Sequence, residues 1–176
     1  MASQRAASAP STGAAGVPAL TAPSLPRRMA CWVYEGFLLF AVLFVAGWLF
    51  SALGQVRNPM DTRRPLLQAF LLIVFAIYFG WFWSKGQTLA MKTWKIRVVD
   101  AAGRPVSQAR ALLRFVCSWL WFVPPLGVLA IWHTTPGRDA LVVLGWVVLW
   151  SLASRLHPQR QFWHDALAGT RLVPAS

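Results

Sequence analysis

The sequence has very few acidic residues. Asp and Glu together number five among 176 residues, against 17 Lys and Arg, and charged residues of either sign make up only 12% of the chain. Hydrophobic residues make up 57%, which is more apolar surface than a soluble domain of this length can bury. So few acids also leave no paired-carboxylate active site. The composition therefore indicates an integral membrane protein.

Histidine and cysteine are also scarce, with three and two copies. His133, His157 and His164 are not spaced as metal ligands. Cys31 and Cys117 lie far apart within apolar runs, where they are read as small buried hydrophobes in preference to a disulfide or a metal pair. No glycine-rich phosphate loop follows a strand. We expect neither an enzyme nor a protein that needs a metal or a cofactor.

The apolar residues form four runs that we predict to be transmembrane helices, arranged as two hairpins. Residues 1–25 are rich in Ala, Ser and Pro and are predicted to be a disordered tail, because they cannot bury enough surface to offset their ordering entropy. Residues 26–173 form the membrane domain. Its predicted spans are 29–53, 66–83, 111–132 and 140–153. The fold class is thus an all-α membrane protein.

Two features of the second half leave its topology open. Pro124 and Pro125 interrupt the third run and predict a kink near its middle, read as a packing kink in preference to a functional hinge. The fourth run has only 14 residues, which is marginal for crossing a bilayer unless Arg138 and Arg155 snorkel or the bilayer thins. A re-entrant hairpin made of the last two runs is the alternative.

Basic residues are distributed unevenly between the two sides of this layout. Thirteen Lys and Arg fall on the N-terminal arm, the central polar stretch and the C-terminal tail, and four fall on the opposite side. The excess predicts that both termini and the central stretch are cytoplasmic. It also favours anionic lipid head groups as partners, and nucleic acid is not expected as one.

The central polar stretch between the hairpins is residues 84–110. Within it, residues 95–100 alternate polar and apolar side chains and residues 104–106 resume after a Gly-containing turn, which predicts a small β-hairpin at the cytoplasmic surface. The basic side chains of this loop are expected to face lipid head groups; they are Lys85, Lys92, Lys95 and Arg97.

A charged residue inside the first span needs explanation. Glu35 lies about two helical turns into the apolar run, where an ionised carboxylate is costly. Arg28 stands seven residues earlier on nearly the same helical face, and Asp165 follows the last apolar run on the same side of the membrane. These three residues are predicted to form one polar cluster. It serves either as a structural clamp between helices or as part of an ion path.

The chain resembles the RDD family of bacterial membrane proteins, named for one arginine and two aspartates. Three features carry the resemblance: Arg28 with an acid seven residues later, the block GQTLAMKTWKIRVVDAAGRPVS, and the terminal HDALAGT. The similarity covers about residues 26–173. It implies that Arg28, or less favourably Arg27, is the family arginine, and that Glu35 and Asp165 occupy the aspartate positions, with His164 beside the second. Glu35 departs from aspartate, and Met91 stands where the family more often has glycine.

The resemblance implies transport, including sodium/proton exchange, which has been suggested for some members. The alternative is an accessory or scaffold protein whose cluster clamps helices and whose basic loop binds lipid or a partner protein. Four short helices barely enclose a pathway, so a transporter is expected to form a homo-oligomer or to join another membrane protein. A seam for this is the small-residue pair Ala76 and Gly80.

Overall fold

A computed structural model describes residues 20–54, 62–132 and 135–175. Apart from residues 20–25, the predicted N-terminal tail lies outside these ranges. The elements follow in the order α1 (Leu25–Gly54), α2 (Arg64–Ser84), α3 (Leu89–Thr93), β1 (Ile96–Asp100), α4 (Gln108–Ser118), the 3₁₀ turn η1 (Trp119–Trp121), α5 (Val123–Ile131), α6 (Pro136–Ala153), α7 (Trp163–Leu167) and β2 (Thr170–Pro174).

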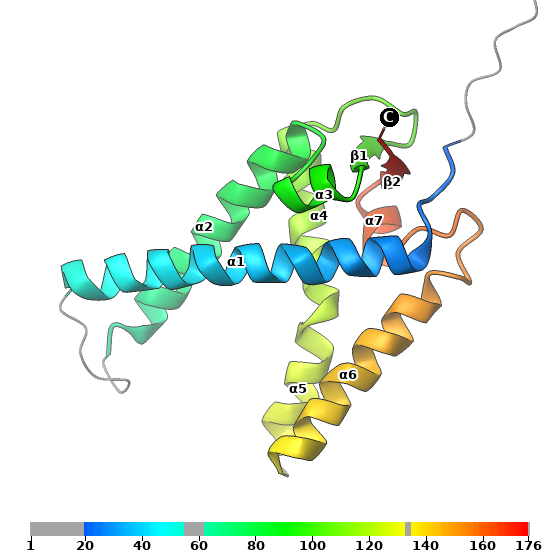
Figure 1. The fold of residues 1–176 in the computed structure, drawn as a ribbon. Coiled ribbons are helices and arrows are strands. Elements are labelled where there is room, and N and C mark those ends of the chain that lie inside the picture. The colour runs from blue at the N-terminus through cyan, green and yellow to red at the C-terminus, as the bar shows by residue number, and fades with distance from the viewer. Residues whose placement is uncertain (1–19, 55–61, 133–134, 176) are drawn as a thin grey trace, which may run out of the picture.

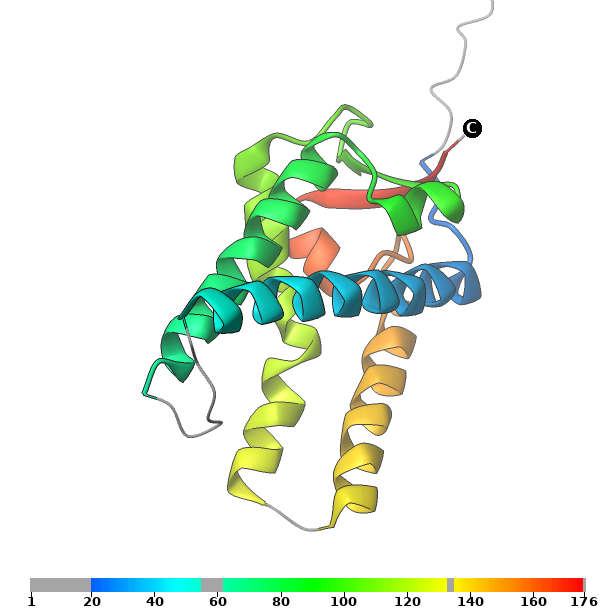
Figure 2. The same ribbon diagram turned by 60° about the vertical axis from the view of Figure 1, so that its left-hand side comes forward.

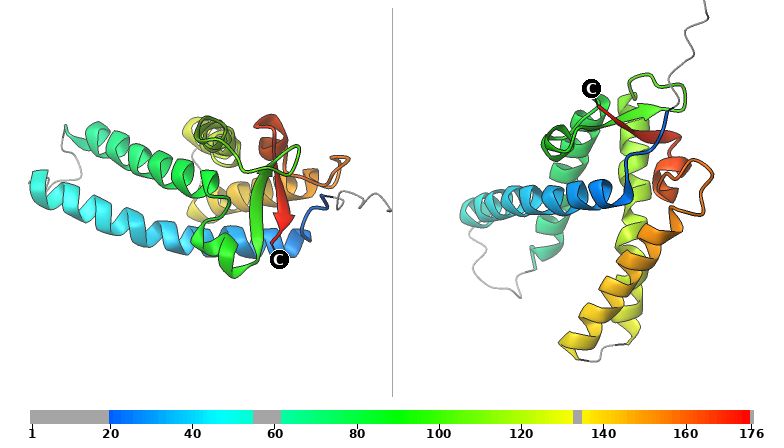
Figure 3. Two further views of the ribbon diagram at one scale, coloured as in Figure 1. Left: turned by 90° about the horizontal axis from the view of Figure 1, so that it is seen from above. Right: turned by 45° about the vertical axis from the view of Figure 1, so that its right-hand side comes forward.

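The helices form two hairpins that diverge from a shared polar end. Helix α2 crosses α1 obliquely, and α5 and α6 form a second pair that crosses the direction of α1 (Figures 1 and 2). The short elements α3, β1, α7 and β2, here called the cap, gather where the hairpins meet. Both ends of the described chain lie beside the cap (Figure 3). This arrangement places the ends of all four long helical segments around one polar centre.

Four helical segments are long and apolar enough to cross a membrane, and they correspond to the four predicted spans. The most apolar stretch of α1 has none of its residues buried within the chain, so its side chains are available to lipid. Helix α6 has 18 residues because it begins at Pro136, four residues before the predicted start. The multi-pass helical fold expected from the sequence is confirmed.

The third span is interrupted just before Pro124 and Pro125. Helix α4 passes into the 3₁₀ turn η1, and α5 then begins at Val123 with the two prolines in its first turn. A proline is tolerated there because the first N–H groups of a helix have no intrahelical acceptor.

The cap contains the predicted small antiparallel sheet, but the second strand differs from the prediction. Strand β1 pairs with β2 from the C-terminal tail, with Ile96 opposite Pro174 and Asp100 opposite Thr170. The Asp100 carboxylate instead accepts hydrogen bonds from the N–H groups of Ala102 and Arg104, which turns the chain away from β1. The predicted hairpin within residues 95–106 is therefore wrong, and the sheet joins the two halves of the sequence.

The small-residue pair of α2 is used within the chain. Gly80 is buried, and a Cβ atom added there would lie 3.0 Å from the Leu112 side chain of α4. Glycine thus permits the close approach of α2 and α4. The prediction that Gly80 contributes to a seam between copies is not supported by this packing.

Gln161 attaches the C-terminal strand to the cap. Its side-chain amide donates to the Leu172 carbonyl at 3.0 Å and its amide oxygen accepts from the Leu172 N–H at 2.9 Å. The side chain is 1% exposed, so water cannot replace these bonds if they are lost.

We predict that Gln161→Ala lowers the free energy of unfolding by about 2 kcal/mol or more, because both polar groups of Leu172 lose a buried partner. Thermal melting in detergent measures the change. Gln159→Ala removes an exposed amide nearby and serves as the control. Equal melting of the two variants would contradict this role for Gln161.

Candidate functional site

One face of α1 carries all of its buried side chains. These are Arg28, Cys31 and Glu35, spaced three and four residues apart and therefore aligned along one side of the helix. A membrane-spanning helix that turns two charged residues inward must find polar partners for them. The cap and the helices that adjoin it supply those partners.

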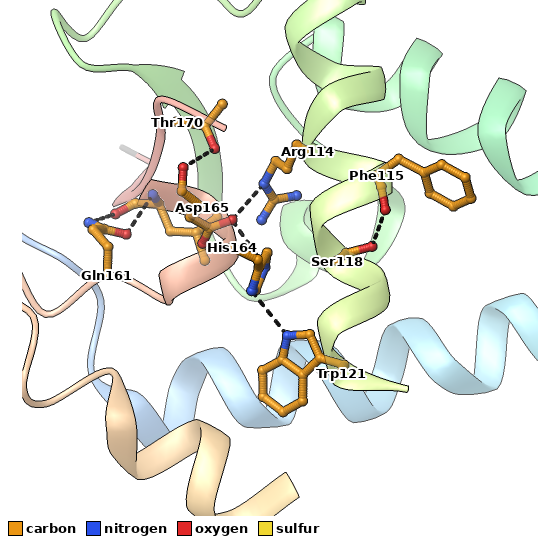
Figure 4. Close-up of polar contacts among 9 residues, drawn as sticks. Arg114, Phe115, Ser118, Trp121, Gln161, His164, Asp165 and Thr170 are labelled. Atoms are coloured by element: carbon orange, nitrogen blue, oxygen red, sulfur yellow. Dashed lines mark hydrogen bonds and ion pairs between the residues drawn. The ribbon is translucent and has the colours of Figure 1, made fainter. Parts of the chain in front are cut away.

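Asp165 of α7 is the centre of a buried hydrogen-bonded chain. Its Oδ1 accepts from Arg114 Nε of α4 at 2.7 Å and lies 3.2 Å from His164 Nε2. The indole N–H of Trp121 donates to His164 Nδ1 at 3.1 Å, and the other ring nitrogen, Nε2, faces Asp165. Figure 4 shows this chain running from α4 through α7 and back to η1.

The electrostatics of this chain fix the charge of Asp165. Its side chain is 0% exposed and that of Arg114 is 6% exposed. Burial by itself would raise the pKa of Asp165, but the Arg114 charge and the His164 N–H outweigh burial and lower the pKa to about 2. The guanidinium of Arg114 also lies 4.0 Å from the centre of the Trp83 ring, a favourable contact for a cation. Asp165 and Arg114 are therefore a permanent ion pair.

Arg28 was predicted to lie between the carboxylates of Glu35 and Asp165, and the structure places it elsewhere. Its guanidinium lies over the Phe162 ring at 4.3 Å and forms no ion pair with Glu35 or Asp165. Among the described residues, its Nε and Nη1 have no hydrogen-bond partner, and the same holds for Asp165 Oδ2. The arginine that pairs with Asp165 is Arg114, which the sequence reasoning missed.

A signal for Arg114 was present in the sequence. Helix α4 is amphipathic, and its buried residues are Ala111, Arg114 and Phe115, which lie on one face. A single arginine on an apolar helical face predicts a buried partner of opposite charge. The sequence alone does not identify Asp165 as that partner, because the two residues are brought together by the packing of α7 on α4.

Glu35 is held by hydroxyl groups. Tyr78 of α2 donates its hydroxyl to Glu35 Oε1 at 2.7 Å, and Thr88 donates to Oε2. Thr88 also caps α3, because its Oγ1 accepts from the Met91 N–H at 3.2 Å. Each carboxylate oxygen thus has one partner, and neither partner carries a charge.

The remaining predicted residues lie outside this buried chain. Arg27 donates from Nε to the Trp94 carbonyl at 2.6 Å and from Nη2 to the Lys95 carbonyl at 2.7 Å. The four basic residues of the predicted lipid-facing loop are all exposed: Lys85, Lys92, Lys95 and Arg97. Among the described residues, no group of His, Cys, Asp and Glu is arranged to hold a metal ion, and Cys31 and Cys117 are free thiols.

Comparison with known proteins identifies the family. The family model for the RDD family matches residues 22–169, which include Glu35, the ion pair of Arg114 with Asp165, and most of the cap. Searches of curated proteins and of solved structures found no match. The chain therefore belongs to the RDD family.

A double-mutant cycle tests which arginine is coupled to Asp165. We expect a coupling energy of about 1–3 kcal/mol between Arg114→Met and Asp165→Asn in thermal melts, because each single change leaves the other group buried without its partner. The matched cycle with Arg28→Met should give a smaller coupling energy. A larger value for Arg28 would show that the assigned pair is wrong.

The charge of Asp165 also predicts a dependence of stability on pH. Because its folded pKa of about 2 is below the ~3.9 of an exposed aspartate, its stabilising contribution is complete above about pH 4 and is lost as the pH falls towards 2. The wild type should therefore lose stability more steeply over this interval than the variant that carries both Arg114→Met and Asp165→Asn. Parallel acid profiles of melting temperature would contradict the prediction.

Proposed function

We propose that this RDD family protein moves protons or small cations across the membrane, for example by sodium/proton exchange, with Glu35 as the group that takes up and releases the proton. The observation that carries the proposal is the shell of Glu35, which consists of two hydroxyl groups in place of a cation. A carboxylate buried in a membrane span is a functional site by default. Its partners decide whether it can change its charge.

Hydroxyl groups can serve both protonation states of a carboxyl group. A hydroxyl donates a hydrogen bond to a carboxylate, and after rotation it accepts one from the protonated acid. Tyr78 and Thr88 can therefore stay in place while Glu35 gains or loses its proton. Arg114 has only N–H donors, so the O–H group of a protonated Asp165 would find no acceptor on it. These properties support Glu35 as the mobile charge and Asp165 as a fixed one.

Arg28 supports the same division of roles. Its guanidinium is buried on the face of α1 that also carries Glu35, and two of its nitrogens have no partner among the described residues. Asp165 Oδ2 is likewise unpartnered. A buried donor and a buried acceptor without partners among the described residues can hydrogen-bond to the water that accompanies a passing ion, which a fully satisfied clamp could not do.

The proposed setting is the bacterial inner membrane, with the cap and both termini in the cytoplasm. The excess of Lys and Arg on the side of the cap supports this orientation. The activity is transport without an enzymatic reaction. The four spanning segments are short and diverge in pairs (Figure 1), so we propose that the active form includes a second copy or another membrane protein.

The second candidate is a non-transporting accessory protein in which the same residues clamp helices. It is favoured by the fact that Glu35 and Asp165 both join separate elements: Glu35 connects α1 with α2 and with the start of α3, and Asp165 connects α7 with α4. In this role the cap would bind lipid or a partner protein through its basic side chains. The two functions make opposite predictions for the isosteric change at Glu35.

We predict that Glu35→Gln abolishes cation-driven proton movement in proteoliposomes and leaves the melting temperature within a few degrees of the wild-type value. The glutamine amide still offers one acceptor and one donor to the two hydroxyls, but it cannot titrate. Tyr34→Phe removes the exposed hydroxyl of the residue beside Glu35 and serves as the control, with flux retained. Absence of flux in the wild type, together with a destabilised Glu35→Gln, would favour the clamp.

A further inference from the structure

An open groove lies between the first turns of α1 and the chain that leaves α3. It has a volume of about 540 Å³ and is lined by Pro26, Arg27, Ala30, Thr93, Trp94 and Lys95. The α1 residues belong to the first turns of a membrane-spanning helix, and the other three lead from α3 into strand β1 of the cap. The groove is therefore at the boundary between the spans and the cap.

The charge of the groove is positive and uncompensated. Arg27 and Lys95 line it, and no acidic residue does. Lys92 is exposed one position before the lining residue Thr93. Asp100, at the other end of β1 from the groove, is engaged by Arg104 at 3.1 Å. An anion placed in the groove would thus meet cations without a competing carboxylate.

The Arg27 guanidinium and the backbone of Lys95 are held in fixed positions. Arg27 is anchored by its hydrogen bonds to the carbonyls of Trp94 and Lys95, so its charge is not free to swing away. Lys95 has a φ of 49°, an uncommon conformation for a residue other than glycine. Its carbonyl accepts from both Arg27 Nη2 and the Ala175 N–H at 2.8 Å, which stabilises this backbone. Such strain, held in place by its surroundings, is typical of binding sites.

Trp94 forms part of the wall of the groove. Its indole nitrogen is buried away from the open groove and has no hydrogen-bond partner among the described residues. The two cations are therefore the groups that would meet a ligand. They favour an oxygen-rich anion such as a phosphate group.

The surface next to the groove favours a lipid as the source of that phosphate. Ala30 is followed on the same face of α1 by Val33, Tyr34 and Phe37, at the spacing of successive turns. Val33 is 49% exposed, Tyr34 40% and Phe37 71%. An apolar strip therefore leads from the groove along the spanning helix, where acyl chains would lie.

We propose that this groove binds the phosphate group of one anionic phospholipid, with Arg27 and Lys95 at the phosphate and the acyl chains along the outer face of α1. The site shares no residue with the Glu35 and Asp165 clusters. The inference is independent of the transport proposal, and the failure of one leaves the other unaffected.

The test is lipid binding to the full-length protein in detergent, measured by native mass spectrometry. Short-chain phosphatidylglycerol is compared with phosphatidylcholine of the same acyl chains and with inorganic phosphate. Lys95→Asn removes the cation and retains a side chain that tolerates positive φ, so the fold is preserved, as a melting curve verifies. Lys85→Asn removes an exposed lysine that does not line the groove and is the matched control.

We expect phosphatidylglycerol to bind in preference to phosphatidylcholine, with an affinity that falls about tenfold in Lys95→Asn, the size of one lost charge-assisted hydrogen bond, and is unchanged in Lys85→Asn. Equal losses in the two variants would indicate diffuse attraction to a basic surface and overturn the site. Equally tight binding of inorganic phosphate would overturn the lipid as its source. Equal binding of the two lipids would overturn the preference for an anion.

Discussion

The buried ion pair between Arg114 and Asp165 holds the two halves of the molecule together. Asp165 follows the last span and Arg114 begins the third, and their 2.7 Å contact brings α7 against α4. This contact places Phe162 beneath Arg28 and positions the C-terminal strand to pair with β1. Each charge compensates for the burial of the other, so removing either one leaves a buried ion without a partner. The cap depends on this pair more than on its short strands.

Glu35 and Asp165 are both buried, and they differ in what surrounds them. Asp165 has a guanidinium and an imidazole N–H as partners, and both favour its ionised form. Glu35 has two hydroxyls, which can serve either protonation state. A protein that only needed to fasten α1 could have used the same cationic partner twice. This difference in surroundings is what supports the proposed movement of charge across the membrane.

The spans and the shared face of Arg28 and Glu35 could be predicted from the sequence, because hydrophobic length and helical periodicity are local properties. The pairing of β1 with β2 could not be predicted, because the alternating polar and apolar residues 95–100 indicate a strand but not the strand that pairs with it. Arg114 was missed for the same reason, since its partner lies 51 residues away. Met91 stands where the family resemblance favours glycine. Its side chain is buried, at 5% exposure, and its backbone N–H donates to the Thr88 hydroxyl. The fold thus accommodates the larger side chain at this position.

Glu35 is the only glutamate in the sequence, so selective labelling of glutamate with ¹³C at the carboxyl carbon yields one signal. The most direct measurement is the chemical shift of that carbon in the folded protein in lipid as the pH is changed. We expect the chemical shift of the Glu35 carboxyl carbon to change reversibly between the values of two protonation states, while α1 stays packed and the melting temperature is maintained. A signal that stays constant until the protein unfolds would show that Glu35 is a fixed charge, and would contradict its role as the proton carrier.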